Sequence, residues 1–443
     1  MEIFIPEHAR QAIDILEHNG YTAYAVGGCI RDSLLGKTPH DWDICTNCRP
    51  EKMKEVFEGF RTIDTGLKHG TVTIMIENEL IEITTFRSDG EYENHRKPAQ
   101  VKFVDDLYLD LERRDFTINA MCCCKSDEVI DLFGSQKDLH NGILRCVGNA
   151  SQRFEEDALR ILRGLRFASV LDFKIHDGTK RAMFEKKQLL ECISSERISE
   201  ELKKLLCGKA AEKVLSEYKE IIAVIIPEIR PCFGFAQNNP HHCYDIWEHI
   251  IKSVSFVRPE PVIRTAMLLH DIGKPSMATK DENGVSHFKK HQFVSAKMAD
   301  EILKRLRFDS RSISYIHDLI WEHDNRIPAD MHSVKRFISK YDFQFMLDYL
   351  EVRRGDTYAQ SDYRRAEKLA ELDEIARLTI ELADQDTCLK ISDLAVNGND
   401  LIALGLDGRD IGIWLEKLLE LVIEDKIKND KTALLEYIKD NIK

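Results

Sequence analysis

The feature that most constrains the fold is a change in periodicity near residue 150. Before it, short alternating segments typical of strands are mixed with helical segments, and from Glu155 the helical period continues to the C-terminus. Gly and Pro interrupt the helical part near residues 227–240 and 397–408. The 443 residues exceed what one ordinary core contains. We therefore predict an α+β fold, with a mixed sheet of about five strands in a head (residues 1–145) and then three all-α parts (146–225, 226–375 and 376–443).

Within the head, the pattern predicts helices over residues 9–18 and 30–35 and a strand over 22–26. Two further strands are expected at 71–76 and 81–86. The polar residues Glu77, Asn78 and Glu79 between them indicate a hairpin turn.

The composition excludes several classes of protein. Hydrophobic residues make up 43% and charged residues 31%, as in a globular protein. No apolar run of about 18 residues and no signal segment is present, so we expect a cytoplasmic protein without a membrane partner. The twelve scattered cysteines indicate reduced thiols, and Cys45 and Cys48 lack the second pair that a structural zinc site needs. With a net charge of -13, any nucleic-acid surface must be a local basic patch.

Two carboxylates near residue 40 are candidate catalytic residues. Asp41 and Asp43 are two positions apart, so on a strand both side chains point to one face. Oxygen ligands of this kind suit Mg²⁺, and two such ions can activate a hydroxyl and stabilise a leaving pyrophosphate. Glu82, on a neighbouring predicted strand, is a candidate third carboxylate. Such a pair on its own is also common as solvated charge on loops.

A glycine pair lies upstream of these carboxylates. Gly27 and Gly28 precede a predicted helix that carries Arg31, and glycines allow the backbone to approach a phosphate. Arg31 is then placed to pair with a triphosphate. The alternative is a plain strand-to-helix turn.

Four segments together resemble one family. GGCIRD, HDWDICT, the stretch from Leu67 to Thr71 and RRDFTINA from Arg113 to Ala120 are similar to the head of bacterial class II CCA-adding enzymes, which are polymerase-β-like nucleotidyltransferases. The resemblance implies addition of CCA to the 3′ end of tRNA from CTP and ATP, by two-metal transfer with Mg²⁺. It also implies that Arg114 contacts the nucleotide and Asp115 the sugar region.

Residues 153–169 predict one amphipathic helix. Asp157, Arg160, Arg163 and Arg166 recur every three residues along it, so they lie near one another on one face. A carboxylate accepts from an exocyclic amine and a guanidinium donates to ring acceptors, a combination that fits cytosine and adenine. The segment also resembles the family's base-reading EDxxR motif. For this segment alone, the alternative to base reading is a surface helix stabilised by salt bridges.

The segment between Phe86 and Val101 is polar and contains Gly and Pro, which indicates a loop. In the family an equivalent loop helps the pocket change from C to A. This chain retains it, including Tyr92, Arg96 and Pro98, which favours complete CCA addition over CC addition.

A second candidate site lies in the helical part of the chain. Its residues are a histidine, His249, then the pair His270 and Asp271 before Gly-Lys-Pro, and then an aspartate, Asp356. This order of H, HD and D resembles the metal ligands of HD-domain phosphohydrolases. Imidazole and carboxylate together suit Mn, Fe, Ni or Co. Candidate ligands for a second ion are two further residues, His291 and His323.

The stretch from about residue 390 to 429 predicts two helices joined through Gly405 and Gly408, with Lys426, Lys428 and Lys431 close by. The family resemblance implies that this tail grips tRNA, and a plain helix hairpin is the alternative. For the whole chain, one alternative is a bacterial poly(A) polymerase or A-adding enzyme. From another class, the alternative is a metal phosphohydrolase with a non-catalytic, RNA-binding head.

Overall fold

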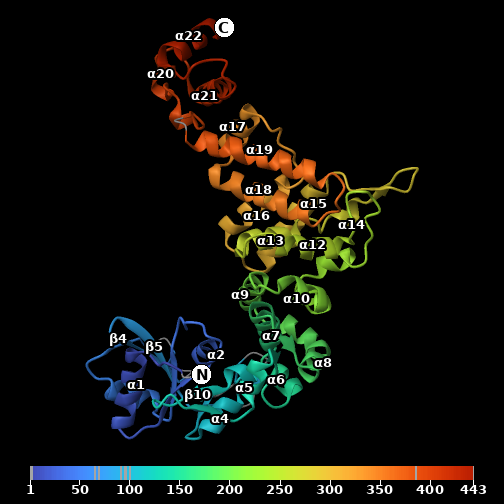
Figure 1. The fold of residues 1–443 in the computed structure, drawn as a ribbon. Coiled ribbons are helices and arrows are strands. Elements are labelled where there is room, and N and C mark those ends of the chain that lie inside the picture. Colours follow the sequence, from blue (N-terminus) through green and yellow to red (C-terminus); the bar gives the residue numbers. More distant parts are fainter. Residues whose placement is uncertain are drawn as a thin grey trace. The chain divides into compact units, whose positions relative to one another are not determined.

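The structure is a computed structural model that describes residues 3–63, 66–67, 70–89, 92–93, 97–98, 101–384 and 387–442. The chain forms two units, Met1–Pro227 with Arg305–Phe308, and Glu228–Lys304 with Asp309–Lys443. Strands and helices mix in the blue and cyan part of the chain in Figure 1, and helices dominate from green to red. This distribution confirms the predicted α+β class. The division into four domains remains a prediction, and α19 (Arg365–Ala383) runs across its boundary at 375 and 376.

A seven-stranded mixed sheet forms the centre of the first unit, in the order β11-β10-β1-β2-β5-β4-β3. Neighbouring strands are antiparallel except for the parallel pair β2 and β5. The expectation of about five strands was too low, because β3, β10 and β11 have three residues each and are too short to show alternation. The seven strands are β1 Ala23–Val26, β2 Asp43–Thr46, β3 Arg61–Ile63, β4 Thr71–Ile76, β5 Glu79–Thr85, β10 Met121–Cys123 and β11 Val129–Asp131.

The predicted hairpin joins β4 to β5. Its two loop residues, Glu77 and Asn78, have φ angles of 51° and 67°. Positive φ at both positions gives the turn the twist that antiparallel strands need. This turn places Glu82 on β5 opposite Asp43 on β2.

Helices pack around this sheet and continue through residues 146–225. The α1 helix buries Ala9, Ile13 and Leu16 on one face, as its apolar period predicts. Farther along the chain α7 packs against α9. The helices of this unit are α1 Glu7–His18, α2 Gly28–Leu34, α3 Pro50–Val56, α4 Leu107–Glu112, α5 Ser135–His140, α6 Ala150–Glu156, α7 Leu159–Leu171, α8 Asp177–Lys186, α9 Ser195–Leu206, α10 Ala211–Glu217 and α11 Lys219–Ile225.

Two expectations about the region after residue 150 were wrong. The helix predicted over 153–169 is interrupted at Asp157, whose extended backbone (φ −137°, ψ 102°) separates α6 from α7. Asp157 instead accepts a hydrogen bond from the amide of Leu159, an interaction that competes with helix continuation. Short strands also occur there, since β13 (Lys174–Ile175) pairs with β12 (Ile143–Leu144), and β14 (Thr279–Lys280) pairs with β15 (Ser286–His287).

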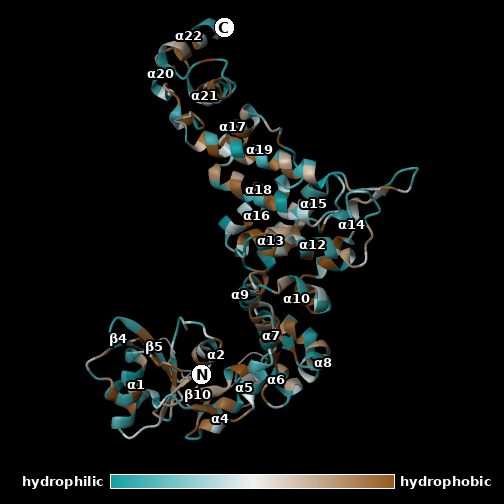
Figure 2. Cartoon of the chain, viewed as in Figure 1, coloured by the Kyte–Doolittle hydropathy of each residue, from teal (hydrophilic) through white to brown (hydrophobic). Residues whose placement is uncertain are grey.

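The second unit is built from helices. Figure 2 shows hydrophilic and hydrophobic residues alternating along them, as expected for helices that bury one face. None of the helices in the described part of the chain is both long and apolar enough to cross a membrane. The unit contains α12 Ile246–Ser255, α13 Pro261–Leu269, α14 Lys274–Met277, α15 His291–Arg305, α16 Ser310–Glu322, α17 Met331–Lys340, α18 Phe343–Tyr358, α19, α20 Gly398–Ile402, α21 Gly408–Ile423 and α22 Lys431–Asn441.

The two helices expected on either side of Gly405 are present as α20 and α21, and a third helix, α22, follows them. They enclose a small core that includes Leu401, Leu418 and Leu434. Two of the lysines predicted to contact RNA are paired with carboxylates of the same segment. Lys426 lies 2.6 Å from Glu424, and Lys431 lies 2.6 Å from Asp400.

The contact between α7 and the end of α9 leaves no room for a side chain at Gly208. A Cβ there would lie 2.1 Å from the Ser169 hydroxyl and 2.5 Å from the Ser169 carbonyl carbon. We expect Gly208→Ala to lower the free energy of unfolding by about 1–3 kcal/mol, because the backbone must shift. Urea unfolding followed by circular dichroism measures this. Gly178→Ala, at an exposed helical position of the same unit, is the control, and equal midpoints for the two variants would contradict the expectation.

Candidate active site and a histidine-rich second site

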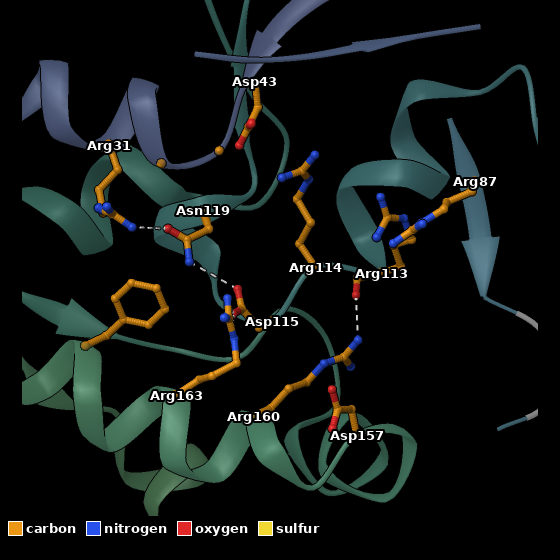
Figure 3. A pocket seen from close by; sticks show the side chains of 13 residues that line it. Arg31, Asp43, Arg87, Arg113, Arg114, Asp115, Asn119, Asp157, Arg160 and Arg163 are labelled. Atoms are coloured by element: carbon orange, nitrogen blue, oxygen red, sulfur yellow. Dashed lines mark hydrogen bonds and ion pairs between the residues drawn. The ribbon is translucent and has the colours of Figure 1, made fainter. Parts of the chain in front are cut away.

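The first unit contains a pocket of about 430 Å³ between the sheet, the loop after α4 and helix α7. Figure 3 shows that Asp43 and Asp157 enter it from opposite sides. The lining is strongly polar, with six arginines facing three aspartates. It consists of Gly27, Gly28, Arg31, Asp43, Arg87, Arg113, Arg114, Asp115, Asn119, Asp157, Arg160, Arg163 and Phe167.

The glycine turn is required by the close approach of an arginine. Gly27 has a φ of 86°, and a Cβ on it would lie 3.0 Å from Arg114 Nη1. Helix α2 begins directly after it and presents Arg31 to the pocket. Arg31 donates to Asn119 Oδ1 at 2.7 Å and pairs with Asp32 at 2.8 Å.

The acidic side of the pocket is formed by neighbouring strands. Asp43 begins β2 and pairs in register with Glu82 on β5, whereas Asp41 precedes the strand. The loss of solvent around Asp43, followed by repulsion from Glu82 and Asp41, raises the pKa of Asp43 to about 6. Glu82 and Asp41 are therefore close enough to repel the charge of Asp43. Asp41 and Glu82 do not line the pocket itself.

Asp110 positions two consecutive arginines. This buried carboxylate binds Arg113 at 2.7 Å and Arg114 at 3.2 Å. Burial favours the neutral carboxyl, but the two guanidinium groups outweigh it and lower the pKa of Asp110. Both arginines are thus fixed at the pocket wall with their charges retained.

Asp115 connects the loop after α4 to helix α7. Its Oδ2 accepts two hydrogen bonds from Arg163, at 2.6 and 2.8 Å, and its Oδ1 accepts one from Asn119 at 3.1 Å. Burial would raise the pKa of Asp115, yet the charge of Arg163 holds it well below its ordinary value. Asn119 also contacts Arg31, so one chain of bonds runs across the pocket.

Asp157 and Arg160 lie on the side of the pocket opposite the carboxylates of the sheet. Arg160 is buried and donates to Glu156 at 2.8 Å and to the Arg113 carbonyl at 3.0 Å. Asp157 binds Arg197 of α9 at 2.8 Å. Although they do not share one continuous helix, the two side chains line the same pocket.

Most of the residues expected to bind nucleotide are brought together. Arg166 is not, because it lies 3.9 Å from the centre of the Phe167 ring and pairs with Glu201 at 2.7 Å. The residues that reach the pocket as predicted are Gly28, Arg31, Asp43, Arg114, Asp115, Asp157, Arg160 and Arg163.

Four further lining residues were not identified from the sequence. Arg113 and Asn119 lie within the RRDFTINA segment, so its other polar residues were a usable signal. Phe167 has the apolar character of an ordinary core residue, and Arg87 lies at the start of the polar loop. Of the expected loop residues, Arg96 and two of the segment Leu67 to Thr71, Lys68 and His69, lie outside the described residues, as do the side chains of Tyr92 and Pro98.

The second unit brings all six predicted HD residues together. One group that could hold an ion comprises His249, His270, Asp271 and Asp356, and a second comprises Asp271, His291 and His323. Within each group the ligand atoms lie within 4.8 Å of one another, and all six residues are buried. Among the described residues, the head carboxylates form no group of this density.

The four histidines have the orientation of metal ligands. Each places Nδ1 on a backbone carbonyl, at 3.2 Å for His249, 2.7 Å for His270 and His291, and 2.6 Å for His323. The Nε2 atoms then converge, with His249 3.3 Å from His270 and His291 3.2 Å from His323. Metal-binding histidines are commonly fixed by such a bond from the other ring nitrogen.

Asp271 lies between the two groups. Its Oδ2 is 3.1 Å from His249 Nε2 and its Oδ1 is 3.0 Å from His291 Nε2. Lys274 Nζ lies 2.6 Å from Oδ2, and neither oxygen accepts a hydrogen bond of good geometry from a described residue. The donor set therefore fits one cation on each side of Asp271. Burial lowers the pKa of His270, but Asp271 and then Asp356 outweigh it and raise that pKa to about 10.

Three family models match parts of this chain. Residues 23–145 match the poly A polymerase head domain, 172–232 match the RNA and SrmB-binding site of polymerase A, and 287–438 match tRNA nucleotidyltransferase domain 2. Among solved structures, the Bacillus stearothermophilus CCA-adding enzyme in complex with CTP is similar at a TM-score of 0.75. It is 27% identical, and the match covers 99% of this chain and 98% of that one.

Relatives of known activity extend this result. The CCA-adding enzyme of Enterococcus faecalis is 47% identical over 219 residues, which is 49% of this chain and spans about half (53%) of that relative. The CCA-adding enzyme of Lactobacillus helveticus is 31% identical over 441 residues, covering 99% of this chain and 98% of the relative. Because this second match runs through both units, the chain belongs to the family of CCA-adding enzymes.

Proposed function

We propose that this protein adds CCA to the 3′ end of tRNA, taking CTP and ATP in turn. The observation that supports this best is that Asp157 and Arg160 line the same pocket as Asp43. Cytosine and adenine both present an amine beside a ring acceptor, and this carboxylate and guanidinium match that pattern. Guanine and uracil present a carbonyl where the amine would be, which Asp157 would repel.

The catalytic end of the pocket suits Mg²⁺. Asp41, Asp43 and Glu82 are the proposed ligands. Loss of solvent, followed by repulsion from Glu82 and Asp41, raises the pKa of Asp43, and a bound cation would offset both effects. When bound, Mg²⁺ would activate the attacking 3′-hydroxyl and stabilise the pyrophosphate that leaves. We assign the triphosphate to Arg31 and Arg114, whose charges face the acidic side.

Asp115 is proposed to hold the sugar end of the nucleotide. Its oxygens already accept bonds from Arg163 and Asn119, so its position is fixed before substrate binds. The fixed carboxylate and arginines would orient the nucleotide without further rearrangement. Incubation with tRNA lacking CCA and each nucleotide triphosphate in turn tests the assignment, and incorporation of A alone would favour the A-adding alternative.

Asp43→Asn should abolish the addition of both C and A. The substitution keeps the size of the side chain but removes a charged metal ligand, which we expect to cost roughly 10³-fold or more in rate. Single-turnover incorporation of labelled CTP and ATP measures it. Asp105→Asn, at an exposed position of the same unit, is the control, and near-normal rates in Asp43→Asn would exclude the assignment.

Asp157→Ala should lose discrimination among bases while retaining transfer. Removing the acceptor leaves Arg160 without the group that selects an amine, so UTP and GTP should be incorporated alongside CTP and ATP. Competition between labelled nucleotides measures selectivity. If the variant keeps wild-type discrimination at the wild-type rate, the base is read elsewhere in the pocket.

We also propose that the second unit is a metal-dependent phosphohydrolase. The support is the double cluster around Asp271, in which buried imidazole and carboxylate groups suit Mn, Fe, Ni or Co. Such an ion, when bound, would supply an activated water at neutral pH. Lys274, 2.6 Å from Asp271 and buried, adds a positive charge that can stabilise a phosphate.

Asp271→Ala should remove phosphohydrolase activity and bound transition metal, whereas the addition of CCA to tRNA should persist. Asp271 contributes to both groups, so its loss affects each ion that the cluster would hold. Metal content by mass spectrometry and release of phosphate from nucleotides measure the outcome. Asp281→Ala, an exposed position of the same unit, is the control. Loss of CCA addition in a folded Asp271→Ala protein would show that the histidine cluster and the pocket of the head are coupled.

A further inference from the structure

A second cavity adjoins the histidine cluster and is not explained by the cluster itself. The cluster opens into a cavity of about 240 Å³, and the neighbouring cavity has about 370 Å³. Together they have the size of a site for a small molecule rather than a polymer. The two share five lining residues, which are His242, His287, Phe288, Asp324 and Gln360.

The outer cavity carries an excess of positive charge. Arg326 and Lys368 line it with one carboxylate, Asp324. Among the described residues, Arg326 has no hydrogen-bond or ion-pair partner. Lys368 is half-buried, and its side-chain partners are neutral groups, Gln360 Oε1 at 2.5 Å and His241 Nδ1 at 3.3 Å.

The surroundings of Lys368 disfavour its positive charge when no anion is bound. Burial lowers the pKa of Lys368, and Arg326, Arg353 and Arg364 lower it further against the opposing effect of Asp356. Burial followed by Lys368 also lowers the pKa of His241. The cationic side chains that line the cavity are therefore the lysine and the arginine.

A single side chain connects this charge to the proposed metal ligands. Gln360 donates from Nε2 to Asp356 Oδ2 at 2.8 Å and accepts from Lys368 at 2.5 Å. Lys368 thus lies one amide group away from Asp356. A molecule whose phosphate sits at the cluster can extend past Gln360 and reach Lys368 and Arg326 with a second anionic group.

We propose that the second unit acts on a small phosphate ester that carries two separate phosphates, one at the histidine cluster and the other bound by Lys368 and Arg326. This inference rests on the proposed phosphohydrolase function. In the reaction, a water oxygen bonds to the phosphorus at the cluster, the bond from that phosphorus to the ester oxygen breaks, and the released alcohol takes up a proton. The second phosphate is not cleaved, and Lys368 and Arg326 recognise the substrate by binding it.

Kinetics with matched substrates test the preference. We expect kcat/KM for adenosine 3′,5′-bisphosphate to exceed that for 3′-AMP and 5′-AMP by about tenfold or more, as a charge-assisted contact allows. Lys368→Gln and Arg326→Gln should each reduce this preference, because kcat/KM should fall more for the bisphosphate than for either monophosphate. Lys297→Gln, an exposed lysine of α15 outside both cavities, is the control.

A second readout is independent of turnover. Acetylation of lysines by an N-hydroxysuccinimide ester, followed by peptide mass spectrometry, reports on the Lys368 amine directly. Adenosine 3′,5′-bisphosphate should slow acetylation of Lys368 several-fold in the wild-type protein, whereas adenosine should not, and Lys297 should react equally throughout. Because the label is read at one residue, nucleotide bound by the head does not contribute.

The outcomes separate this inference from the function on which it rests. Equal kcat/KM for the monophosphates and the bisphosphate, or no protection of Lys368, overturns the second anion site while hydrolysis stands. Protection of Lys368 without hydrolysis of any substrate supports the anion site and overturns the proposed phosphohydrolase activity.

Discussion

The ion pair between the buried carboxylate of Asp115 and the half-buried Arg163 is the interaction on which the pocket of the head depends. It joins the loop that carries Arg113 and Arg114 to the helix that carries Arg160, with distances of 2.6 and 2.8 Å. A buried carboxylate is tolerated only when it is paired and hydrogen-bonded, and Asp115 receives bonds from the side chains of Arg163 and Asn119 and from the amide of Phe116. The bond from Arg160 to the Arg113 carbonyl, at 3.0 Å, joins the same two segments.

The histidine cluster follows a similar logic with a different solution. Its ligands come from α12, the ends of α13 and α16, the start of α15, and α18, and backbone carbonyls hold each imidazole by Nδ1. The bonds to the carbonyls fix the direction of every Nε2. The packing of the helices therefore holds the imidazole and carboxylate groups close together despite the loss of solvent around them. In the head, ion pairs between side chains fix the site, whereas here the helix ends do so.

The sequence predicted the elements around both sites better than it predicted their details. Periodicity located β4, β5 and α1 to within a few residues, because these segments are long enough to repeat a pattern. It missed the three-residue strands of the sheet and the break at Asp157, where a local hydrogen bond outweighs helical propensity. Arg166 was expected in the pocket from its spacing alone, but contacts with Phe167 and Glu201 direct it elsewhere.

By itself, the sequence determined which chemistry was available. Paired carboxylates, the glycine turn, the arginine-rich segments and the order of histidines and aspartates are local properties, and residue types retain their ligand chemistry wherever they fold. The tertiary structure alone decided which of them meet. His249 and Asp356 are 107 positions apart yet lie 2.9 Å from each other, and Gln360 joins that cluster to Lys368. Such contacts depend on how helices pack, and packing is a property of whole buried faces that no short segment of sequence contains.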